Sequence, residues 1–379
     1  MHGITLFPLG NADCCRVDLE CGRQLLIDYA AMRDPSDPKD ARCDLAAELS
    51  ADLKGRGRHH YDVVAFTHLD QDHLKGATEF FHLDHARKYQ GHDRVKIKEL
   101  WVPAALITEP NPDDPEARIL QREARHRFKE KRGVRVFSRP ERLKDWCDGN
   151  AVDLSERLDL ITDAGSVAPG FSLGSDGVEF FVHSPFAFRQ DENTLEDRNG
   201  DCLVLHARFQ VGHVRTQALF LSDVTHEALS DIVAVSVAHG NTGRLEWDIA
   251  KLPHHCSYLA LGPEKGKDAT EPTVDIARLY EKHGQKGAIL VSTSARIPSK
   301  GRQADKADDP PHRQAAEYYR GVAAALNGEF VVTMEHPSAE APQPLVIEIG
   351  SRKATLRKRA QKAAGRVTSQ RAPRAGNAS

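Results

Sequence analysis

The chain has 379 residues, of which 40% are hydrophobic and 28% charged, a composition typical of a water-soluble globular protein. The formal net charge of -3 gives the chain as a whole no electrostatic attraction to nucleic acid. No run of apolar residues is long enough to predict a transmembrane helix, and the N-terminus lacks the pattern of a secretion signal.

Short apolar runs predict the strands of the N-terminal third, at residues 4–9, 23–28, 61–67, 98–102 and 134–137. Leucines at helical spacing predict a helix over residues 44–53. Periodic apolar residues among charges predict an exposed helix over residues 115–132. Residues 139–176 show weak periodicity with several glycines and prolines, which favours a surface insertion.

The remainder of the chain continues the mixture of strands and helices. Strands are expected at residues 178–185, 202–209, 216–223, 247–252 and 288–292, and helices at 227–238 and 312–326. Because strands often follow one another in adjacent pairs, the pattern favours an α/β sandwich of mixed sheets over a doubly wound parallel sheet.

The C-terminal end is strongly basic. Nine Lys or Arg residues follow Glu348, with no acidic residue among them. We therefore divide the chain into a domain over residues 1–349 and a basic tail over 350–379. The tail is either a disordered solubilising segment or an electrostatic arm for a polyanion such as nucleic acid, and both interpretations stay open.

Seven cysteines are present, an odd number, with no pair spaced C-x-x-C. This argues against a disulfide framework and against a cysteine zinc site. Reduced thiols in a cytoplasmic protein are the simplest interpretation.

The segment F-T-H-L-D-Q-D-H-L, residues 66–74, carries four potential metal ligands directly after a predicted buried strand: His68, Asp70, Asp72 and His73. Imidazole and carboxylate groups bind zinc, manganese and iron. Four ligands are more than one open catalytic metal usually takes from a single loop, so the segment predicts a two-metal site completed by residues from elsewhere. A solvated charged loop is the alternative, which the spacing, the preceding strand and the small Gly76 together disfavour.

This segment resembles the H-x-[HD]-x-D-H signature of the metallo-β-lactamase superfamily. The aspartate at the third position is similar to the variant in the metallohydrolase domain of the competence protein ComEC and its soluble relatives. Other segments resemble that family in the same order: F-P-L-G-N-A-D-C-C-R-V, L-L-I-D-Y, N-G-D-C-L-V-L, F-L-S-D-V and L-P-H-H-C-S. The resemblance implies a four-layer αββα sandwich over roughly residues 3–326.

The resemblance also implies the ligands of two divalent metal ions, zinc or manganese. His68 and Asp70 would hold the first metal, and Asp72 and His73 the second. Asp223 matches the superfamily's bridging aspartate and His255 its final histidine. His254 would then lie behind the ligands or face the substrate, although the two histidines could exchange roles.

Departures from the family pattern leave three positions open. Asp201 stands where the superfamily often has a histidine, and it could bind metal or cap its strand. Cys256 replaces the usual glycine of H-H-G-S and is either a zinc ligand or, as we favour, a packed neutral thiol. Asp13 is expected to anchor the metal loop from behind. His183 and His206 are interpreted as structural, and His312 is a weaker site candidate.

The implied reaction is hydrolysis by a metal-activated water, which Asp72 and Asp223 would orient while His254 stabilises or protonates the leaving oxygen. We predict a nuclease or phosphodiesterase with nucleic acid as substrate. The alternatives are a hydrolase of a small ester, thioester or lactam, and a non-catalytic nucleic-acid-binding component. The family further implies protein partners in a bacterial multi-gene system. No membrane partner is expected.

Overall fold

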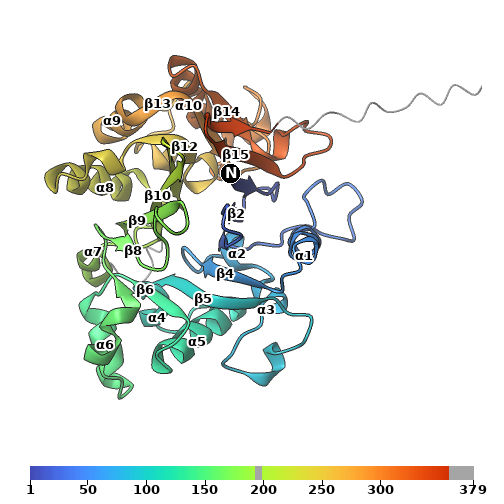
Figure 1. Cartoon of the computed structure of the whole chain (residues 1–379). Coiled ribbons are helices and arrows are strands. Elements are labelled where there is room, and N and C mark those ends of the chain that lie inside the picture. Colours follow the sequence, from blue (N-terminus) through green and yellow to red (C-terminus); the bar gives the residue numbers. More distant parts are fainter. Residues whose placement is uncertain (193–198, 358–379) are drawn as a thin grey trace, which may run out of the picture.

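Two β-sheets form the centre of the protein in the computed structural model, which describes residues 1–192 and 199–357 (Figure 1). Among these residues the first sheet has nine strands in the order β16-β15-β1-β2-β3-β4-β5-β6-β7. Strands β15, β1, β2 and β3 pair antiparallel, whereas β3 to β7 pair parallel. The strands are β1 His2–Leu6, β2 Cys15–Asp18, β3 Gln24–Ile27, β4 His60–Ala65, β5 Lys96–Pro103, β6 Val134–Phe137, β7 Ile161–Thr162, β15 Leu345–Gly350 and β16 Lys353–Leu356.

The second sheet has seven strands within the described part of the chain, in the order β14-β13-β12-β11-β10-β9-β8. It repeats the arrangement of the first, because β8 to β11 pair antiparallel and β11 to β14 pair parallel. Its strands are β8 Val167–Ala168, β9 Val178–Ser184, β10 Val204–Val211, β11 Val214–Leu221, β12 Trp247–Lys251, β13 Gly284–Ser292 and β14 Glu329–Val332.

Helices cover the outer face of each sheet (Figure 1). Buried leucines of α1 and α5 pack with strands of the first sheet, and those of α8 and α9 pack with strands of the second. The helices are α1 Leu45–Gly55, α2 Gln71–Leu74, α3 Ala77–Phe80, α4 Ala104–Thr108, α5 Pro115–Lys129, α6 Glu141–Gly149, α7 Ala187–Glu192, α8 His226–Ala238, α9 Val274–His283 and α10 Arg313–Ala325.

A separate apolar core lies between the two sheets. It joins Val17 and Val63 of the first sheet to Phe180 and Ile249 of the second, all at most 2% exposed. Strands that are apolar on both faces, such as β4, supply one side chain to this core and the next to the helix layer. The result is a four-layer αββα sandwich, which confirms the predicted fold class.

The structure adds detail at two predicted boundaries. Residues 139–176 contain α6 and the edge strands β7 and β8, and Phe171 reaches the core between the sheets. Two-residue strands leave no periodicity from which they could be predicted. The tail also begins later than residue 350, since β16 pairs with β15 over residues 353–356. Residues 358–379 lie outside the described part of the chain.

No helix among the described residues is long and apolar enough to cross a membrane.

His183 and His206 lie on neighbouring strands of the second sheet and are buried. The Nε2 atom of His183 lies 3.0 Å from the carbonyl of Arg244, and that of His206 lies 3.1 Å from the carbonyl of Glu246. Burial, with the nearby Arg244 charge, lowers the pKa of His183 to about 4. Both histidines are therefore neutral structural residues, as the sequence interpretation had it.

We predict that stability falls as the pH drops from 6.5 to 4, because the unfolded chain binds a proton at residue 183 that the folded protein excludes. The full effect is about 3 kcal/mol of unfolding free energy. His183→Gln should flatten the dependence of that free energy on pH, measured by urea denaturation at several pH values. His213→Gln, at an exposed position, should leave it unchanged. An equal pH slope in both variants would contradict the prediction.

Candidate metal centre

The potential ligands meet at one rim of the sandwich, where parallel strands of both sheets end. Strand β4 ends at Ala65, and the loop after it leads into α2, which carries Asp72 and His73. Asp223 follows β11, and His255 lies in the short 3₁₀ turn η4, His254–Cys256, after β12. Each sheet therefore supplies two ligands, as expected for sites at the carboxyl ends of strands.

Four ligand atoms, one each from Asp72, His73, Asp223 and His255, lie within 4.8 Å of one another. The Nε2 atom of His73 is 3.2 Å from Asp223 Oδ1. The Nε2 atom of His255 is 3.1 Å from Asp72 Oδ2 and 3.4 Å from Asp223 Oδ2. This set contains the second-metal ligands that the sequence predicted, together with the bridging aspartate.

Buried polar atoms without partners show that this cluster fits a cation. His73 Nε2 and Asp223 Oδ1 face each other, yet neither forms a hydrogen bond with a described residue, and the same holds for His68 Nε2. Leaving such an atom unsatisfied costs about 1–3 kcal/mol. A divalent metal held by His73 and Asp223 would satisfy both of these atoms, and imidazole with carboxylate is a donor set that zinc and manganese accept.

The remaining imidazole nitrogens are held by groups behind the cluster. His73 Nδ1 lies 2.8 Å from Asp28 Oδ2, and His255 Nδ1 lies 2.8 Å from the carbonyl of Thr293. Both contacts direct Nε2 toward the centre. Asp28 is itself fixed by the backbone N–H and the hydroxyl of Thr67. The sequence analysis missed Asp28, although its position directly after an apolar strand was a usable signal.

Opposite charges compensate one another within the cluster. Burial would raise the pKa of Asp223, but the neighbouring His255 and His73 hold this pKa well below its usual range. Burial would lower the pKa of His73, but Asp223 and Asp28 raise it well above its usual range. The carboxylates and imidazoles thus stabilise one another's charged forms.

Lys251 and Asp13 form a buried ion pair behind the ligands, with side chains that are 8% and 4% exposed. Lys251 ends β12 in the second sheet, whereas Asp13 lies between β1 and β2 of the first. The Asp13 backbone N–H also donates to the carbonyl of Asp72 at 2.9 Å. The pair therefore connects the two sheets directly beneath the ligand loops. Asp13 anchors the metal loop as expected, but Lys251 was not foreseen.

The predicted first-metal pair lies beside the cluster. His68 Nε2 is 3.6 Å from Asp70 Oδ2, and the His68 ring centroid is 4.0 Å from that of His73. Asp201 is 8% exposed, and it belongs to neither group of clustered ligand atoms found among the described residues. Metal binding by Asp201 stays a prediction.

The turn that carries His255 has an unusual backbone. His254, His255 and Cys256 have φ values of 47°, 50° and 66°, in the left-handed region that favours glycine. Each such residue costs on the order of 1–3 kcal/mol. The Cys256 side chain is packed in the outer core of the second sheet, and burial raises the pKa of its thiol to about 12. It is therefore a neutral thiol in the metal-free protein.

Both ring nitrogens of His312 contact backbone groups. Its Nδ1 accepts from the Tyr258 N–H at 3.3 Å, and its Nε2 lies 3.0 Å from the carbonyl of Asp308. These contacts explain the proline-histidine segment structurally, without a metal. His254 lies at the rim beside His255, with ring centroids 6.4 Å apart.

No family model matches the chain, and no curated protein matches it. Solved structures similar to it include a diphosphatase of the PhnP family, with 12% identity over 94% of this chain and 100% of that chain and a TM-score of 0.38. Unliganded yeast PDE1 shows 9% identity over 87% and 97% of the two chains, with a TM-score of 0.42. Zinc-bound PqqB from Methylobacterium extorquens shows 10% identity over 92% and 100%, with a TM-score of 0.33. Similarity at this level concerns the fold at most, so the function has to be argued from the residues.

We predict that Lys251→Met lowers the free energy of unfolding by about 3–5 kcal/mol, because it leaves Asp13 as a buried carboxylate without a cation. Urea denaturation in the presence of EDTA measures this effect without metal. The double variant Lys251→Met, Asp13→Asn should recover part of the lost free energy of unfolding. Lys144→Met removes the exposed pair with Asp148 and should leave the unfolding midpoint unchanged. A Lys251 variant no less stable than the Lys144 variant would contradict the role of the pair.

We predict that Asp28→Asn weakens metal binding about 10- to 100-fold, because the amide holds the His73 ring less strongly than the carboxylate does. Isothermal titration with Mn²⁺ and Zn²⁺ measures the change. The matched control is Asp248→Asn, which alters a buried carboxylate of β12 that accepts from Gln217 and Lys353. Equal metal affinities in the two variants would show that Asp28 does not support the centre.

Proposed function

We propose that the protein is a metal-dependent phosphodiesterase, most simply a nuclease. The observation that carries this proposal is the cluster of half-buried Asp72 with buried His73, Asp223 and His255, with His68 and Asp70 directly beside it. Such a carboxylate-rich arrangement can hold two cations close together. Two cations suit a substrate that is itself anionic and gains charge in the transition state.

The ligand assignment follows the two neighbouring groups. We assign Asp72, His73 and His255 to one metal and His68 and Asp70 to the other. Asp223 is assigned to both metals. Asp201 is a further ligand of the metal that His68 and Asp70 hold. Zinc and manganese both fit these donors. The resemblance of the Asp70 variant and of H-H-C-S to ComEC and its soluble relatives supports nucleic acid as the substrate class.

When bound, the metals would lower the pKa of a water molecule so that it can attack, and would neutralise charge on the phosphoryl oxygens. The chain's own groups would orient the reactants. Asp72 and Asp223 would accept hydrogen bonds from the attacking water and fix its direction. His254, at the rim of the cluster, would donate a proton or a hydrogen bond to the leaving oxygen.

The cellular setting is proposed on less direct grounds. All seven cysteines are free in the structure, which supports a reducing compartment such as the cytoplasm. The family resemblance supports action alongside other proteins of a bacterial multi-gene system.

We predict that the manganese-loaded protein cleaves at least one of single-stranded DNA, double-stranded DNA, RNA and cyclic nucleotides. Asp72→Asn should lower the rate on the order of 1,000-fold, because several kcal/mol of transition-state stabilisation are lost. Asp231→Asn is the control, since its side chain is 42% exposed on α8, compared with 32% for Asp72.

Product analysis on gels, with the metal content of each sample measured, gives a clear outcome. Absence of cleavage of all four substrates by a metal-loaded sample would refute the proposal. Turnover of thioesters or lactones, insensitive to salt, would instead identify a small-molecule hydrolase on the same fold.

A further inference from the structure

A second polar surface lies at the opposite rim of the first sheet, where β4 and β5 begin. Two adjoining hollows of about 390 and 370 Å³ share His59. Six cationic side chains line them: Lys54, Arg58, Arg94, Lys96, Lys98 and Arg127. We call this surface the basic rim.

The basic rim contrasts with the charge of the rest of the protein. Six Lys or Arg residues and no acidic residue lie in 358–379, so residues 1–357 carry a formal charge of -9 against -3 for the whole chain. The hollows nevertheless include just two carboxylates, Asp84 and Asp93, among the residues that line them. A cationic surface on an acidic body creates a local positive potential that attracts anions.

Several of these cations lack a carboxylate partner. Lys54 and Lys96 are exposed and form no ion pair with any residue in 1–192 or 199–357. Arg94 donates to the carbonyls of Thr78 and Phe81 rather than to an acid. The charges of these three side chains are therefore not neutralised by a carboxylate of the described residues, whereas Arg127 pairs with Glu123 and Asp84.

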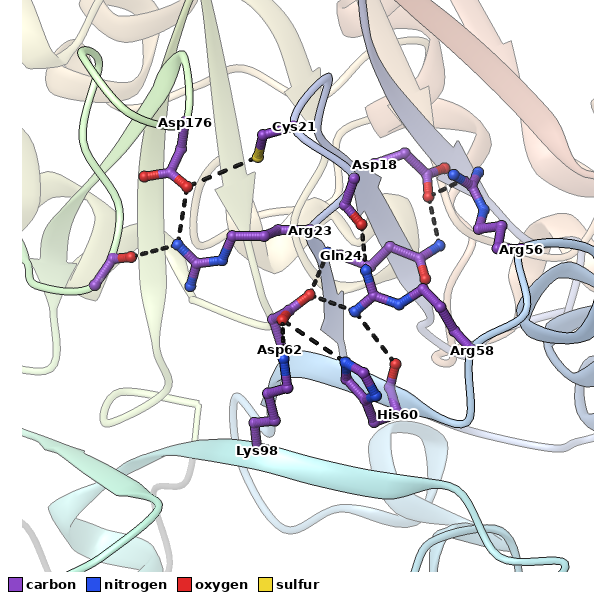
Figure 2. Close-up of polar contacts among 12 residues, drawn as sticks. Asp18, Cys21, Arg23, Gln24, Arg56, Arg58, His60, Asp62, Lys98 and Asp176 are labelled. Atoms are coloured by element: carbon purple, nitrogen blue, oxygen red, sulfur yellow. Dashed lines mark hydrogen bonds and ion pairs between the residues drawn. The ribbon is translucent and has the colours of Figure 1, made fainter.

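Two further cations are held in place by a carboxylate beneath them (Figure 2). Asp62 is 6% exposed and pairs with Arg58 and with Lys98, the latter at 2.9 Å, while its other partners include the Gln24 backbone N–H. The Lys98 side chain is 58% exposed, so its ammonium group remains accessible from solvent. One buried anion thus fixes two cations at the surface, as a preorganised binding site requires.

The chemistry of the rim favours a phosphate backbone over a protein partner. His59, His60, His82 and His92 line the hollows and can donate to phosphate oxygens in their neutral form. The exposed large apolar residues of the described chain are Met1, Leu158, Val167, Phe188, Leu259 and Val274, none of which lines either hollow. Protein interfaces usually need such an apolar centre.

The basic rim is separate from the metal centre. His60 begins β4, and the metal ligands follow the end of the same six-residue strand. At about 3.3 Å per residue, the two sites lie about 20 Å apart along the sheet. We propose that the basic rim binds the phosphate backbone of a nucleic acid at a point remote from the metal centre. The choice of nucleic acid as partner rests on the proposed function.

The test measures binding of fluorescent single- and double-stranded oligonucleotides by anisotropy, in EDTA and across a salt series, with the full chain. The double variant Lys54→Gln, Lys96→Gln should reduce the slope of log K against log salt by about 2, and should weaken binding tenfold or more at 100 mM salt. The control is Lys282→Gln, Lys286→Gln, which alters two exposed lysines of α9 and β13 without ion pairs among described residues. It should leave both quantities unchanged.

Equal effects of the two double variants, or no effect of either, would overturn the proposal, since the C-terminal tail is present in both. Binding to phosphatidylserine vesicles but to no oligonucleotide would also overturn it. Because the assay uses EDTA, its outcome does not depend on catalysis. Failure of the proposed phosphodiesterase activity would appear separately, as absent cleavage by the metal-loaded wild type.

Discussion

Four carboxylates converge at one rim of the sandwich. Their mutual repulsion is a constraint that the surrounding residues must compensate. Asp13, Asp28 and Asp223 are each at most 3% exposed, and Asp72 lies beside them. Isolated buried carboxylates would be very unfavourable. The structure supplies His73, His255 and Lys251 as compensating cations, and it recruits them from both sheets. The same convergence makes the rim a candidate cation site, and the Lys251–Asp13 pair connects the two sheets there.

Local sequence was sufficient to predict the elements that position this rim. The apolar run of β4, the ligands after it and the strand before Asp223 are all visible from neighbouring residues. Asp28 and Lys251 were missed because their roles depend on contacts with residues far away in the sequence, 45 and 238 positions distant. Strands β7 and β8 were missed because two residues carry no periodicity. Metal binding by His68, Asp70 and Asp201 remains a prediction, because these residues lie outside the cluster of ligand atoms that the structure brings together.

The three residues of η4 have left-handed backbone conformations that glycine would adopt more easily. Their side chains nevertheless make contacts that glycine could not make. Glycine at position 256 would relax the turn, but it would remove a side chain that packs against the outer helices. Cysteine is small and apolar when its thiol is neutral, so it fills that space at a moderate conformational cost. The turn is held by its surroundings, because His255 is fixed from behind by Thr293 and His254 donates its N–H to Ser222. Strain at a site of this kind persists only when neighbouring contacts determine the conformation.

The direction of the parallel strands separates two opposite electrostatic fields. Their carboxyl ends meet the rim that carries Asp13, Asp28, Asp72 and Asp223, which we call the acidic rim. Their amino ends meet the basic rim. The carboxylates at the first are countered by His73, His255 and Lys251, whereas Lys54, Lys96 and Arg94 at the second have no carboxylate partner among the described residues, so a polyanion is attracted to the basic rim. Metal binding at the acidic rim would add positive charge there, although His73 and His255 would have to be neutral to act as ligands. Binding of an anion at the acidic rim should then depend on metal, whereas binding at the basic rim should not, because its cations belong to the chain itself.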